Sequence, residues 1–330
     1  MPADSMIDIL ISENIAGAPV DALRSKFKVA FEPDLWKNRK ALTEAISGAR
    51  AIIVRNNTDV DAALLRAATN LIAVGRAGVG LDNIDMKAAT ELGIVVAFTP
   101  DQNSISAAEL ALAFMMALAR NIPAASADTC AGNWNRNRFM GGTELYGKTL
   151  GIIGAGKIGF LTASRARAFG MNILAYDPFL SEDHVFLRQL CADQVELDEL
   201  LSRSDFVSCH VPASPATDGM LDAARLRRMK KTAFLVNTSR GRLIVEEDLI
   251  EALKTGVIAG AALDVRRTEP PQPGELEKLP NVILTPHIGA FTVEAQERVT
   301  RTVCADIERL LAGQPALNPA TPFRLPQRKA

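Results

Sequence analysis

The chain is 330 residues long, 48% of them hydrophobic and 23% charged, and its formal net charge is −1. This length favours two domains, and the composition is typical of a globular protein that buries ample apolar surface. A net charge so close to zero gives no general attraction to nucleic acid or to an anionic membrane surface, so we expect neither as a partner.

The cysteines and histidines do not predict a disulfide framework or a metal site. The four cysteines are scattered without a C-x-x-C pair, which is typical of reduced thiols in a cytoplasmic protein. The three histidines have no metal-ligand spacing, so we expect no metal. The opening MPADSMIDIL does not resemble a signal peptide, and the apolar stretch 105–118 is interrupted by Glu109 and too short to span a bilayer.

Short apolar runs alternate with helical patterns up to residue 96. Strands that alternate with helices at this spacing predict a parallel sheet covered by helices on both faces. A glycine-rich loop occupies residues 76–80. The expected strands are 7–11, 28–31, 51–54, 71–74 and 94–96, and the expected helices are 19–26, 39–46, 60–68 and 85–92.

A long apolar helix over residues 104–120, followed by another from Pro123, is expected to lead into a second domain. That domain begins with the stretch 149–177, which has the order strand, glycine turn, helix, strand and acidic residue. The turn contains the motif G-x-G-x-x-G in the sequence GAGKIG. This context favours a dinucleotide site, whereas the motif alone would leave another Rossmann-like nucleotide binder as the alternative.

Each part of this stretch has a mechanical role. Gly154 permits a tight turn, Gly156 lets a pyrophosphate approach the backbone, and Gly159 lets the helix pack close to the strand. The N-terminus of the helix attracts an anion through its unpaired N–H groups and its dipole. Asp177 can accept hydrogen bonds from the adenosine ribose and would repel a 2′-phosphate, which favours NAD over NADP.

The alternation of strands and helices resumes after Asp177 and predicts a second doubly wound sheet. A final helix over residues 291–311 is expected to return to the first domain. We expect the proline-rich tail from Gln314 to be extended or partly disordered. The remaining expected strands are 206–209, 233–236, 259–263 and 282–284, and the remaining helices are 182–190 and 196–201.

Three charged residues stand just beyond strand ends, where open α/β sheets bind ligands. Arg240 follows FLVNTS, Glu269 follows AALDV and His287 follows VILTP. These residue types suit the oxidation of a 2-hydroxy acid. A histidine takes the hydroxyl proton near neutral pH, a carboxylate orients its ring, and an arginine binds the substrate carboxylate with two prongs.

A series of motifs in a fixed order runs through the chain. It consists of GRAGVGLDNID (75–85), the glycine fingerprint, HVPASPAT (210–217), NTSRGRLIVEEDLIEAL (237–253), ALDVRRTEP (262–270) and LTPHIGA (284–290). In this series the chain resembles the D-isomer-specific 2-hydroxyacid dehydrogenases over nearly its whole length. The resemblance implies an NAD-binding Rossmann domain, residues 104–293, inserted into a flavodoxin-like substrate domain, residues 1–103 and 294–330, with a substrate cleft between two doubly wound parallel-sheet domains.

The resemblance also implies roles for individual residues. Arg240 would bind the substrate carboxylate and carbonyl, His287 would be the acid/base and Glu269 its partner, while the backbone of Gly78 and Val79 would bind the substrate carboxylate. A homodimer through the NAD-binding domain is expected. The implied cofactor-binding residues are Gly154, Gly156, Lys157, Ile158, Gly159, Asp177, Pro178, Val211, Pro212, Thr217, Thr238, Asp264 (near the nicotinamide carboxamide) and Gly289.

One position departs from the family, which commonly has an aromatic residue after ALDV. This chain has Arg266 and Arg267 there. The departure leaves Arg240, Glu269 and His287 intact, and we expect the two arginine side chains to face solvent.

Two further stretches resemble a narrower group of the family. Residues 53–58 (IVRNNT) are similar to the substrate loop of 3-phosphoglycerate and sulfolactate dehydrogenases, and residues 132–152 to the segment before the fingerprint in phosphoglycerate dehydrogenases. Arginines of such stretches bind the distal anion, one of them across a dimer interface, so Arg55 and Arg136 are the candidates here. The alternative is a glycerate dehydrogenase or hydroxypyruvate reductase, with Arg55 in a structural salt bridge.

Two other functions fit the same residues. Phosphite oxidation on this scaffold is compatible with Arg240, Glu269 and His287. An NAD(H)-sensing, corepressor-like binding protein is the alternative from a different class, because such proteins can retain the same three residues. Turnover of 2-keto acids with NADH would separate an enzyme from a sensor.

Overall fold

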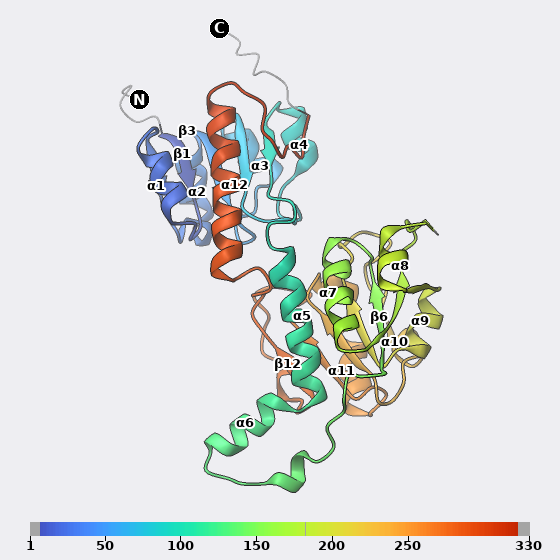
Figure 1. Ribbon diagram of the computed structural model, residues 1–330. Helices are drawn as coiled ribbons and strands as arrows, with labels where there is room; N and C mark the ends of the chain where they lie inside the picture. Colours follow the sequence, from blue (N-terminus) through green and yellow to red (C-terminus); the bar gives the residue numbers. More distant parts are fainter. Residues whose placement is uncertain (1–6, 182, 323–330) are drawn as a thin grey trace. The chain divides into compact units, whose positions relative to one another are not determined.

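The computed structural model describes residues 7–181 and 183–322. The chain divides into two compact units, one reaching to Asn103 and resuming at Thr292, the other running from Ser104 to Phe291 (Figure 1). The assignment of a substrate-binding domain and an NAD-binding domain with boundaries at residues 103 and 293 stays a prediction. Each unit contains one parallel sheet, as the alternating pattern predicts.

The first unit follows the expected alternation of strands and helices. The last helix of the chain, α12, packs against the strands β3, β4 and β5 of this unit, so the chain does return to it. The elements are β1 (Ile7–Ile11), α1 (Ala18–Arg24), β2 (Val29–Phe31), η2 (Leu35–Lys37), α2 (Arg39–Ile46), β3 (Ala49–Val54), α3 (Ala62–Ala67), β4 (Ala73–Arg76), α4 (Met86–Glu91), β5 (Val95–Ala97) and α12 (Val293–Leu311).

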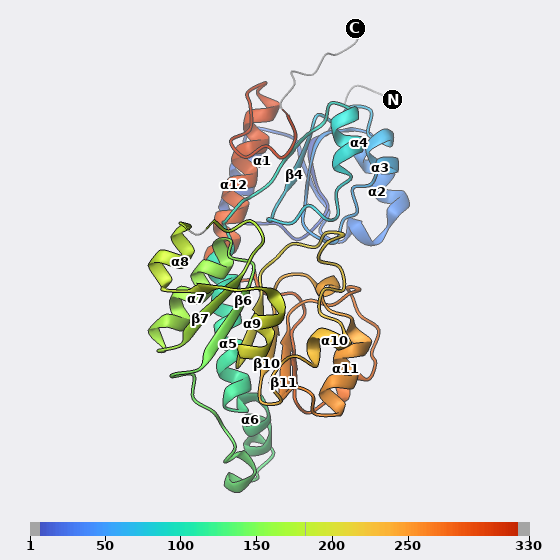
Figure 2. The same ribbon diagram turned by 90° about the vertical axis from the view of Figure 1, so that its right-hand side faces the viewer.

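The sheet of this unit has five parallel strands in the order β2-β1-β3-β4-β5. This flavodoxin-like order is confirmed, and it reverses between β1 and β3, where such folds place their ligands. One apolar cluster lies between the sheet and the helices α1 and α12, and a second lies beneath α2, α3 and α4. Figure 2 shows these two sets of helices on opposite faces of the sheet.

Packing between β4 and α12 is so close that it requires a glycine. A Cβ on Gly75 would lie 2.7 Å from the side chain of Val303 and 2.9 Å from that of Ile307. The glycine therefore lets α12 approach the strand that leads into the predicted substrate loop at residues 76–80.

The start of the C-terminal tail lies along β5 and is extended. The N–H of Ala320 donates to the carbonyl of Val96 at 2.7 Å, and the N–H of Val96 donates to Oγ1 of Thr321 at 2.8 Å. The buried carboxylate of Asp306 accepts the N–H of Leu317 at 2.6 Å. Residues 323–330, for which partial disorder is predicted, lie outside the described residues.

The second unit contains the remaining elements. The strand β8, the helices α10 and α11 and the short 3-10 helices η3, η4 and η5 were not expected; β8 is only two residues long. The predicted helix start at residue 182 lies outside the described residues. The elements are α5 (Ser104–Ala119), α6 (Ile122–Cys130), η3 (Arg136–Phe139), β6 (Thr149–Ile153), α7 (Lys157–Ala168), β7 (Asn172–Tyr176), α8 (Val185–Leu190), β8 (Asp193–Gln194), α9 (Leu197–Arg203), β9 (Phe206–Cys209), α10 (Ala223–Leu226), β10 (Phe234–Asn237), η4 (Gly241–Leu243), α11 (Glu246–Lys254), β11 (Gly260–Leu263), η5 (Leu276–Lys278) and β12 (Val282–Leu284).

Its sheet has seven parallel strands in the order β12-β11-β10-β9-β6-β7-β8. The order reverses between β6 and β9, as expected for a doubly wound Rossmann sheet. The helices α5, α7 and α8 cover one apolar cluster, and α9, α10 and α11 cover the other. The glycine turn therefore leaves the sheet at its point of reversal.

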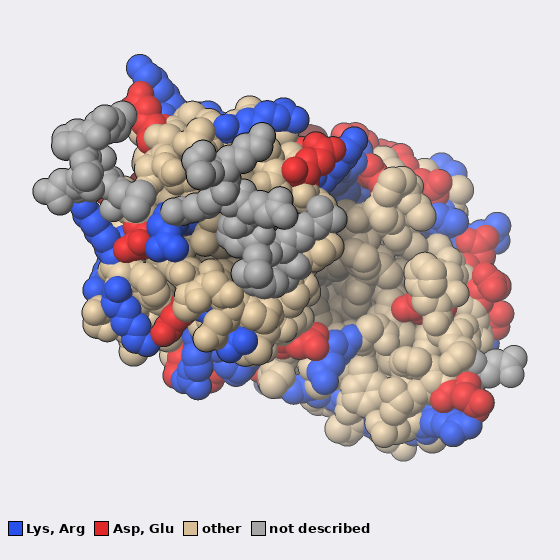
Figure 3. Space-filling model, turned by 90° about the horizontal axis from the view of Figure 1, so that it is seen from above, with Lys and Arg blue, Asp and Glu red and all other residues tan. Residues whose placement is uncertain are grey.

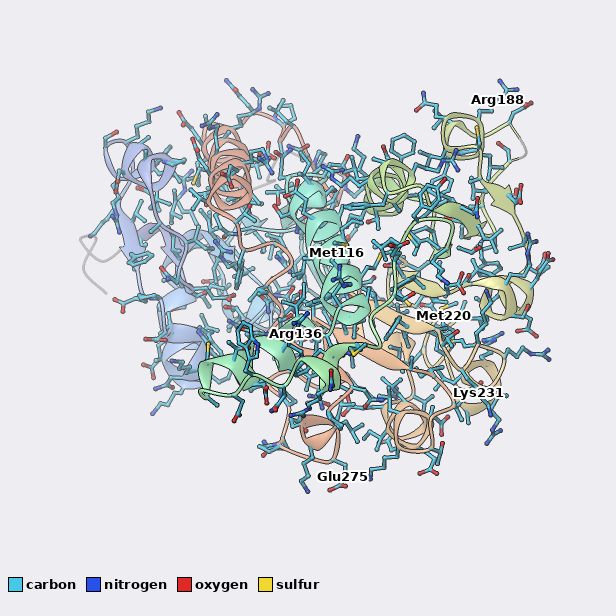
Figure 4. The ribbon with its side chains drawn as sticks, turned by 60° about the horizontal axis from the view of Figure 1, so that its bottom comes forward. Met116, Arg136, Arg188, Met220, Lys231 and Glu275 are labelled. Atoms are coloured by element: carbon cyan, nitrogen blue, oxygen red, sulfur yellow. The ribbon has the colours of Figure 1, made fainter. Side chains whose placement is uncertain are left out.

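An arm formed by α6 and residues 131–144 extends from the body of the second unit (Figures 1 and 2). No residue of α6 is buried, and the side chains of Trp134 and Met140 on the arm are both 78% exposed. Asp128 of α6 accepts hydrogen bonds from the side chains of Asn135 and Arg138 and so holds the arm's turn together. Figure 4 shows Arg136 on this arm, next to α6.

Several charged residues of the first unit form pairs of opposite sign. Lys26 pairs with Glu308 at 2.7 Å and Arg50 with Asp8 at 3.2 Å. Figure 3 shows Lys and Arg atoms interspersed with Asp and Glu atoms over the face that it presents.

Within residues 7–181 and 183–322, no single helix is long and apolar enough to cross a membrane; α5 and α6 reach that length only together, with a 65° bend between them.

Candidate active site

The ends of three neighbouring strands bring the predicted catalytic residues together. Arg240 follows β10, Glu269 lies in the loop after β11, and His287 lies in the loop after β12. These strands are adjacent and parallel, so their carboxyl ends meet at one edge of the sheet. The second unit alone therefore holds all three side chains.

Glu269 and His287 form a direct hydrogen bond. The distance between Oε2 of Glu269 and Nδ1 of His287 is 2.6 Å, and both side chains are about one-third exposed, at 31% and 36%. Burial alone would raise the pKa of Glu269, but the hydrogen bond and charge of His287, the N–H of Arg266 and the charge of Arg240 together hold that pKa below its ordinary value. The carboxylate therefore stays ionised and accepts a proton-bearing Nδ1.

The loop that carries His287 is held by Asp264, the first residue after β11. The carboxylate of Asp264 is 1% exposed and accepts the N–H groups of Ile288 at 2.8 Å and Gly289 at 2.7 Å, and the hydroxyl of Thr285. The carbonyl of Asp264 accepts the N–H of His287 at 2.8 Å. His287 itself has a left-handed backbone, with φ at 56°, which these contacts stabilise.

Arg240 stands in a turn that is fixed by its neighbours. The side-chain amide of Asn237 donates to the carbonyl of Arg240 at 2.9 Å, and the N–H of Ser239 donates to Oδ1 of Asn237 at 3.0 Å. The hydroxyl of Ser239 donates to the carbonyl of Val211 after β9. The main chain that presents the Arg240 guanidinium is thus bonded within its own turn and to the next strand.

The expectation that Arg266 faces solvent is wrong. Its side chain is 9% exposed and forms ion pairs with Glu246, at the start of α11, and with Glu277 of η5. The sequence gives no sign of this contact, because the partners come from elements that are distant along the chain. Arg267 does lie nearer the surface, with its side chain 46% exposed.

Two of the three fingerprint glycines are required by the protein's own packing. Gly154 has φ at 97°, and a Cβ there would lie 2.7 Å from the side chain of Val211. A Cβ on Gly159 would lie 2.1 Å from the carbonyl oxygen of Gly154. Gly156 is different, because no described atom outside its immediate neighbours lies within 4 Å of a Cβ placed there. The open space at Gly156 is where the fingerprint predicts a pyrophosphate.

The N-terminus of α7 begins with Lys157 and Ile158 and is capped by no described side chain. Its first N–H groups and its dipole therefore favour an anion. Asp177, at the end of β7, accepts the N–H of Ala155 at 3.0 Å and that of Phe179, just past Pro178, at 2.9 Å. Each oxygen of a carboxylate can accept a further hydrogen bond, so these contacts are compatible with ribose binding.

Two predicted cofactor residues differ in their hydrogen bonding. Oγ1 of Thr238 is buried and has no hydrogen-bond partner among residues 7–181 and 183–322, as expected for a group that awaits a ligand. Oγ1 of Thr217 instead donates to the carbonyl of Pro212 at 2.8 Å and fixes the turn after β9. The open space at Gly156, the uncapped α7 and the orphaned hydroxyl of Thr238 fit a bound dinucleotide.

The other two histidines have structural contacts. Nδ1 of His184 accepts the N–H of Phe186 and caps α8. His210 follows β9, and its Nε2 lies 2.9 Å from the hydroxyl of Ser208. Burial lowers the pKa of His210 to about 3, so the ring is neutral at physiological pH.

The predicted substrate loop of the first unit is pinned by a carboxylate that the sequence did not single out. Glu13, which follows β1, is 2% exposed. Its carboxylate accepts the N–H groups of Arg55 at 2.7 Å, Asn57 at 3.2 Å and Thr58 at 3.0 Å. Burial lowers the pKa of Arg55, and the negative charge of Glu13 opposes this effect. Glu13 thus fixes the turn from which Arg55 projects.

The second predicted substrate loop lies after β4 in the same unit. The N–H of Gly78 donates to the carbonyl of Arg76 at 2.9 Å, and Val79 is 38% exposed. A Cβ on Gly78 would lie 1.9 Å from the guanidinium of Arg76, so the backbone of Gly78 lies close to this buried cation. The loop therefore presents its backbone over a positive charge, which favours an anion.

Comparison with known proteins identifies relatives of the whole chain. Residues 112–289 match the family model described as "D-isomer specific 2-hydroxyacid dehydrogenase, NAD binding domain". D-3-phosphoglycerate dehydrogenase of Methanocaldococcus jannaschii is 43% identical over 325 residues, which is 98% of this chain and 61% of that protein. This chain thus spans about three fifths of the length of that curated relative.

Solved structures match the chain over their full length. The TT0316 protein of Thermus thermophilus has a TM-score of 0.89 and 34% identity, and the match covers 96% of this chain and 100% of that one. A glyoxylate reductase of Paecilomyes thermophila has a TM-score of 0.84 and 31% identity, covering 97% and 99%. Both the fold and the NAD-binding domain predicted from the sequence are confirmed.

Substitution of Gly156 separates cofactor binding from folding. Gly156→Ala has room within the protein, so we expect the melting temperature to stay near that of the wild type. The added methyl occupies the predicted pyrophosphate position, and we expect NADH affinity, measured by fluorescence titration, to fall about tenfold or more, a loss of about 1.4 kcal/mol or more. Gly141→Ala, which also has open space and no left-handed φ, is the matched control. Wild-type affinity in Gly156→Ala would contradict the assignment.

Proposed function

Because the chain belongs to the D-isomer-specific 2-hydroxyacid dehydrogenase family, we propose that it is an NAD-dependent enzyme acting on a CH–OH group. It transfers a hydride reversibly between C2 of a small 2-hydroxy acid and the nicotinamide. The observation that carries this proposal is the 2.6 Å contact between Glu269 and His287, in the unit that also holds Arg240 and the dinucleotide turn.

The geometry supports a defined role for each side chain. Nδ1 of His287 bears the proton that is shared with Glu269, which leaves Nε2 to accept the substrate hydroxyl proton during oxidation and to return it during reduction. Glu269, ionised through its lowered pKa, orients the ring and stabilises the imidazolium. Arg240 binds the substrate carboxylate. NAD supplies the hydride acceptor, and the Asp177 carboxylate favours it over a 2′-phosphorylated cofactor.

Two alternatives remain as outcomes of the test. A glycerate dehydrogenase or hydroxypyruvate reductase would use the same three residues with a singly charged substrate. An NAD(H)-sensing binding protein would keep the dinucleotide turn and bind NADH without turnover.

The free thiols of Cys130 and Cys191 are exposed, which supports a reducing, cytoplasmic location that cell fractionation can test.

A panel of 2-keto acids tests the activity. Purified protein, NADH or NADPH, and phosphohydroxypyruvate, sulfopyruvate, hydroxypyruvate, glyoxylate or pyruvate are mixed, and nicotinamide absorbance is followed. We expect turnover of at least one acid with NADH and slower turnover with NADPH. His287→Ala should lower kcat by about two to four powers of ten, the contribution typical of a general acid/base. Tight NADH binding without turnover of any acid would reject the enzyme and favour the sensor.

We propose that Arg55 binds a second anionic group, as in 3-phosphoglycerate or sulfolactate. Arg55→Ala leaves the backbone N–H that donates to Glu13, so the loop keeps its anchor. A charge-assisted contact is worth about 1.5–3 kcal/mol, so kcat/KM should fall by about 10- to 100-fold on doubly anionic substrates. Singly anionic substrates should change little, and so should Arg24→Ala, an exposed arginine of α1. Equal losses on both substrate classes would reject the distal-anion role.

We also propose a homodimer formed through the second unit. The arm supports it, because α6 has no buried residue and Trp134 and Met140 are both 78% exposed; Tyr146, just beyond the arm, is 77% exposed. Arg136 lies on this arm and is proposed to reach the distal anion of a partner subunit. Sedimentation equilibrium at micromolar concentration should give a dimer, and Trp134→Ser should weaken it. A wild-type monomer would reject the proposal.

A further inference from the structure

Arg266 joins three segments of the second unit beside the candidate active site. Its guanidinium makes a two-pronged contact with Glu246, with Nε to Oε2 at 3.0 Å and Nη2 to Oε1 at 2.7 Å. Its remaining nitrogen, Nη1, donates to Oε1 of Glu277 at 2.5 Å. Glu246 begins α11 and Glu277 lies in η5, so one side chain ties the loop after β11 to both elements.

The charges of this cluster reinforce one another. The hydrogen bond from Arg266 to Glu246, with a further contribution from Glu277, raises the pKa of Arg266 above its ordinary value despite burial. The hydrogen bond from Arg266 lowers the pKa of Glu277. A planar guanidinium that meets one carboxylate with two parallel bonds is fixed in direction as well as in charge. The side chain therefore holds its own backbone in one place.

The backbone of Arg266 is in turn the support of Glu269. Its N–H donates to Oε1 of Glu269 at 3.0 Å, while Oε2 of the same carboxylate meets Nδ1 of His287. On its other side, a Cβ on Gly241 would lie 2.0 Å from the carbonyl carbon of Arg266. The main chain of Arg266 is thus packed between the turn after Arg240 and the carboxylate of Glu269.

We propose that Arg266 is a positioning residue for the Glu269–His287 pair. Its ion pairs with Glu246 and Glu277 fix the N–H that holds one oxygen of Glu269, and this leaves the other oxygen directed at Nδ1 of His287. This proposal rests on the proposed function for its kinetic effect, but not for its structural effect, which is the tautomer and orientation of the His287 ring.

The kinetic experiment compares Arg266→Met with Arg267→Met. Methionine keeps much of the length of the side chain and removes both ion pairs. Displacement of a catalytic group by about an ångström costs up to about a hundredfold, so kcat should fall by about 10- to 100-fold. KM should change by less than about threefold, because the turn of Arg240 is held by Asn237. Arg267→Met, which loses only an exposed contact to Asp218, should resemble the wild type.

A conservative variant shows whether the direction of the Arg266 guanidinium matters as well as its positive charge. Arg266→Lys restores the positive charge but cannot contact Glu246 with two parallel bonds. We therefore expect a kcat between those of Arg266→Met and the wild type. If Arg266→Met does not fold, Glu277→Gln removes one of the two ion pairs at a partly exposed position and should give a smaller loss in the same direction.

The second measurement does not depend on activity. A long-range proton–nitrogen NMR correlation of the wild type should show the His287 ring in the Nδ1–H form, and Arg266→Met should show a mixture of the two neutral tautomers. The chain has three histidines, and a His287→Gln spectrum assigns the signal. A protein without turnover but with this tautomer change would reject the proposed function and keep the positioning role. A folded Arg266→Met variant with unchanged tautomer and kcat, or an equal effect of Arg267→Met, would overturn it.

Discussion

The carboxylate of Asp264 is the group on which the candidate active site depends. It joins the end of β11 to the loop after β12 through the N–H groups of Ile288 and Gly289 and the hydroxyl of Thr285. Hydrogen bonds to a charged group contribute about 1.5–3 kcal/mol each. The left-handed backbone of His287 costs about 1–3 kcal/mol, so these contacts together outweigh it. These contacts therefore help to hold His287 toward Glu269.

Two more buried carboxylates, those of Glu13 and Asp306, also hold a loop or the tail in place through backbone N–H groups. They differ from Glu269, the acid that is proposed to take part in the reaction. Glu13 pins the loop of Arg55, and Asp306 pins the tail beside β5. All three have an exposed fraction of 2% or less and accept backbone N–H groups. Glu269 is the exception, because its side chain is 31% exposed and one of its oxygens meets a titratable ring. A buried acid whose oxygens are all occupied holds structure, whereas a partly exposed acid beside a histidine is available to chemistry.

The sequence predicted the features that a short stretch of chain encodes by itself. Alternating strands and helices predicted both sheets, and the spacing of Gly154, Gly156 and Gly159 with Asp177 predicted the dinucleotide turn. The pinning roles of Asp264 and Glu13 could not be predicted, because each depends on which loops meet at a sheet edge. The same reason applies to Arg266, whose partners lie on α11 and η5.

The proposed cofactor site and the proposed substrate site are built differently at the two sheets. This difference explains why the sequence predicted the identity of the cofactor more readily than that of the substrate. Each sheet reverses its strand order once, between β6 and β9 in one unit and between β1 and β3 in the other. At the first reversal the second unit has a glycine turn and a helix that no described side chain caps, so the proposed cofactor recognition comes from the backbone. Such a site has a motif, because packing requires glycine at positions 154 and 159 and the predicted pyrophosphate requires it at 156. At the second reversal the main chain of Arg55 is held by the carboxylate of Glu13, which follows another strand and lies 42 residues away along the chain, so no short stretch of sequence encodes this contact. The proposed role of Arg55 would make substrate identity depend on the direction and charge of this one side chain, and a comparison of substrates tests that role.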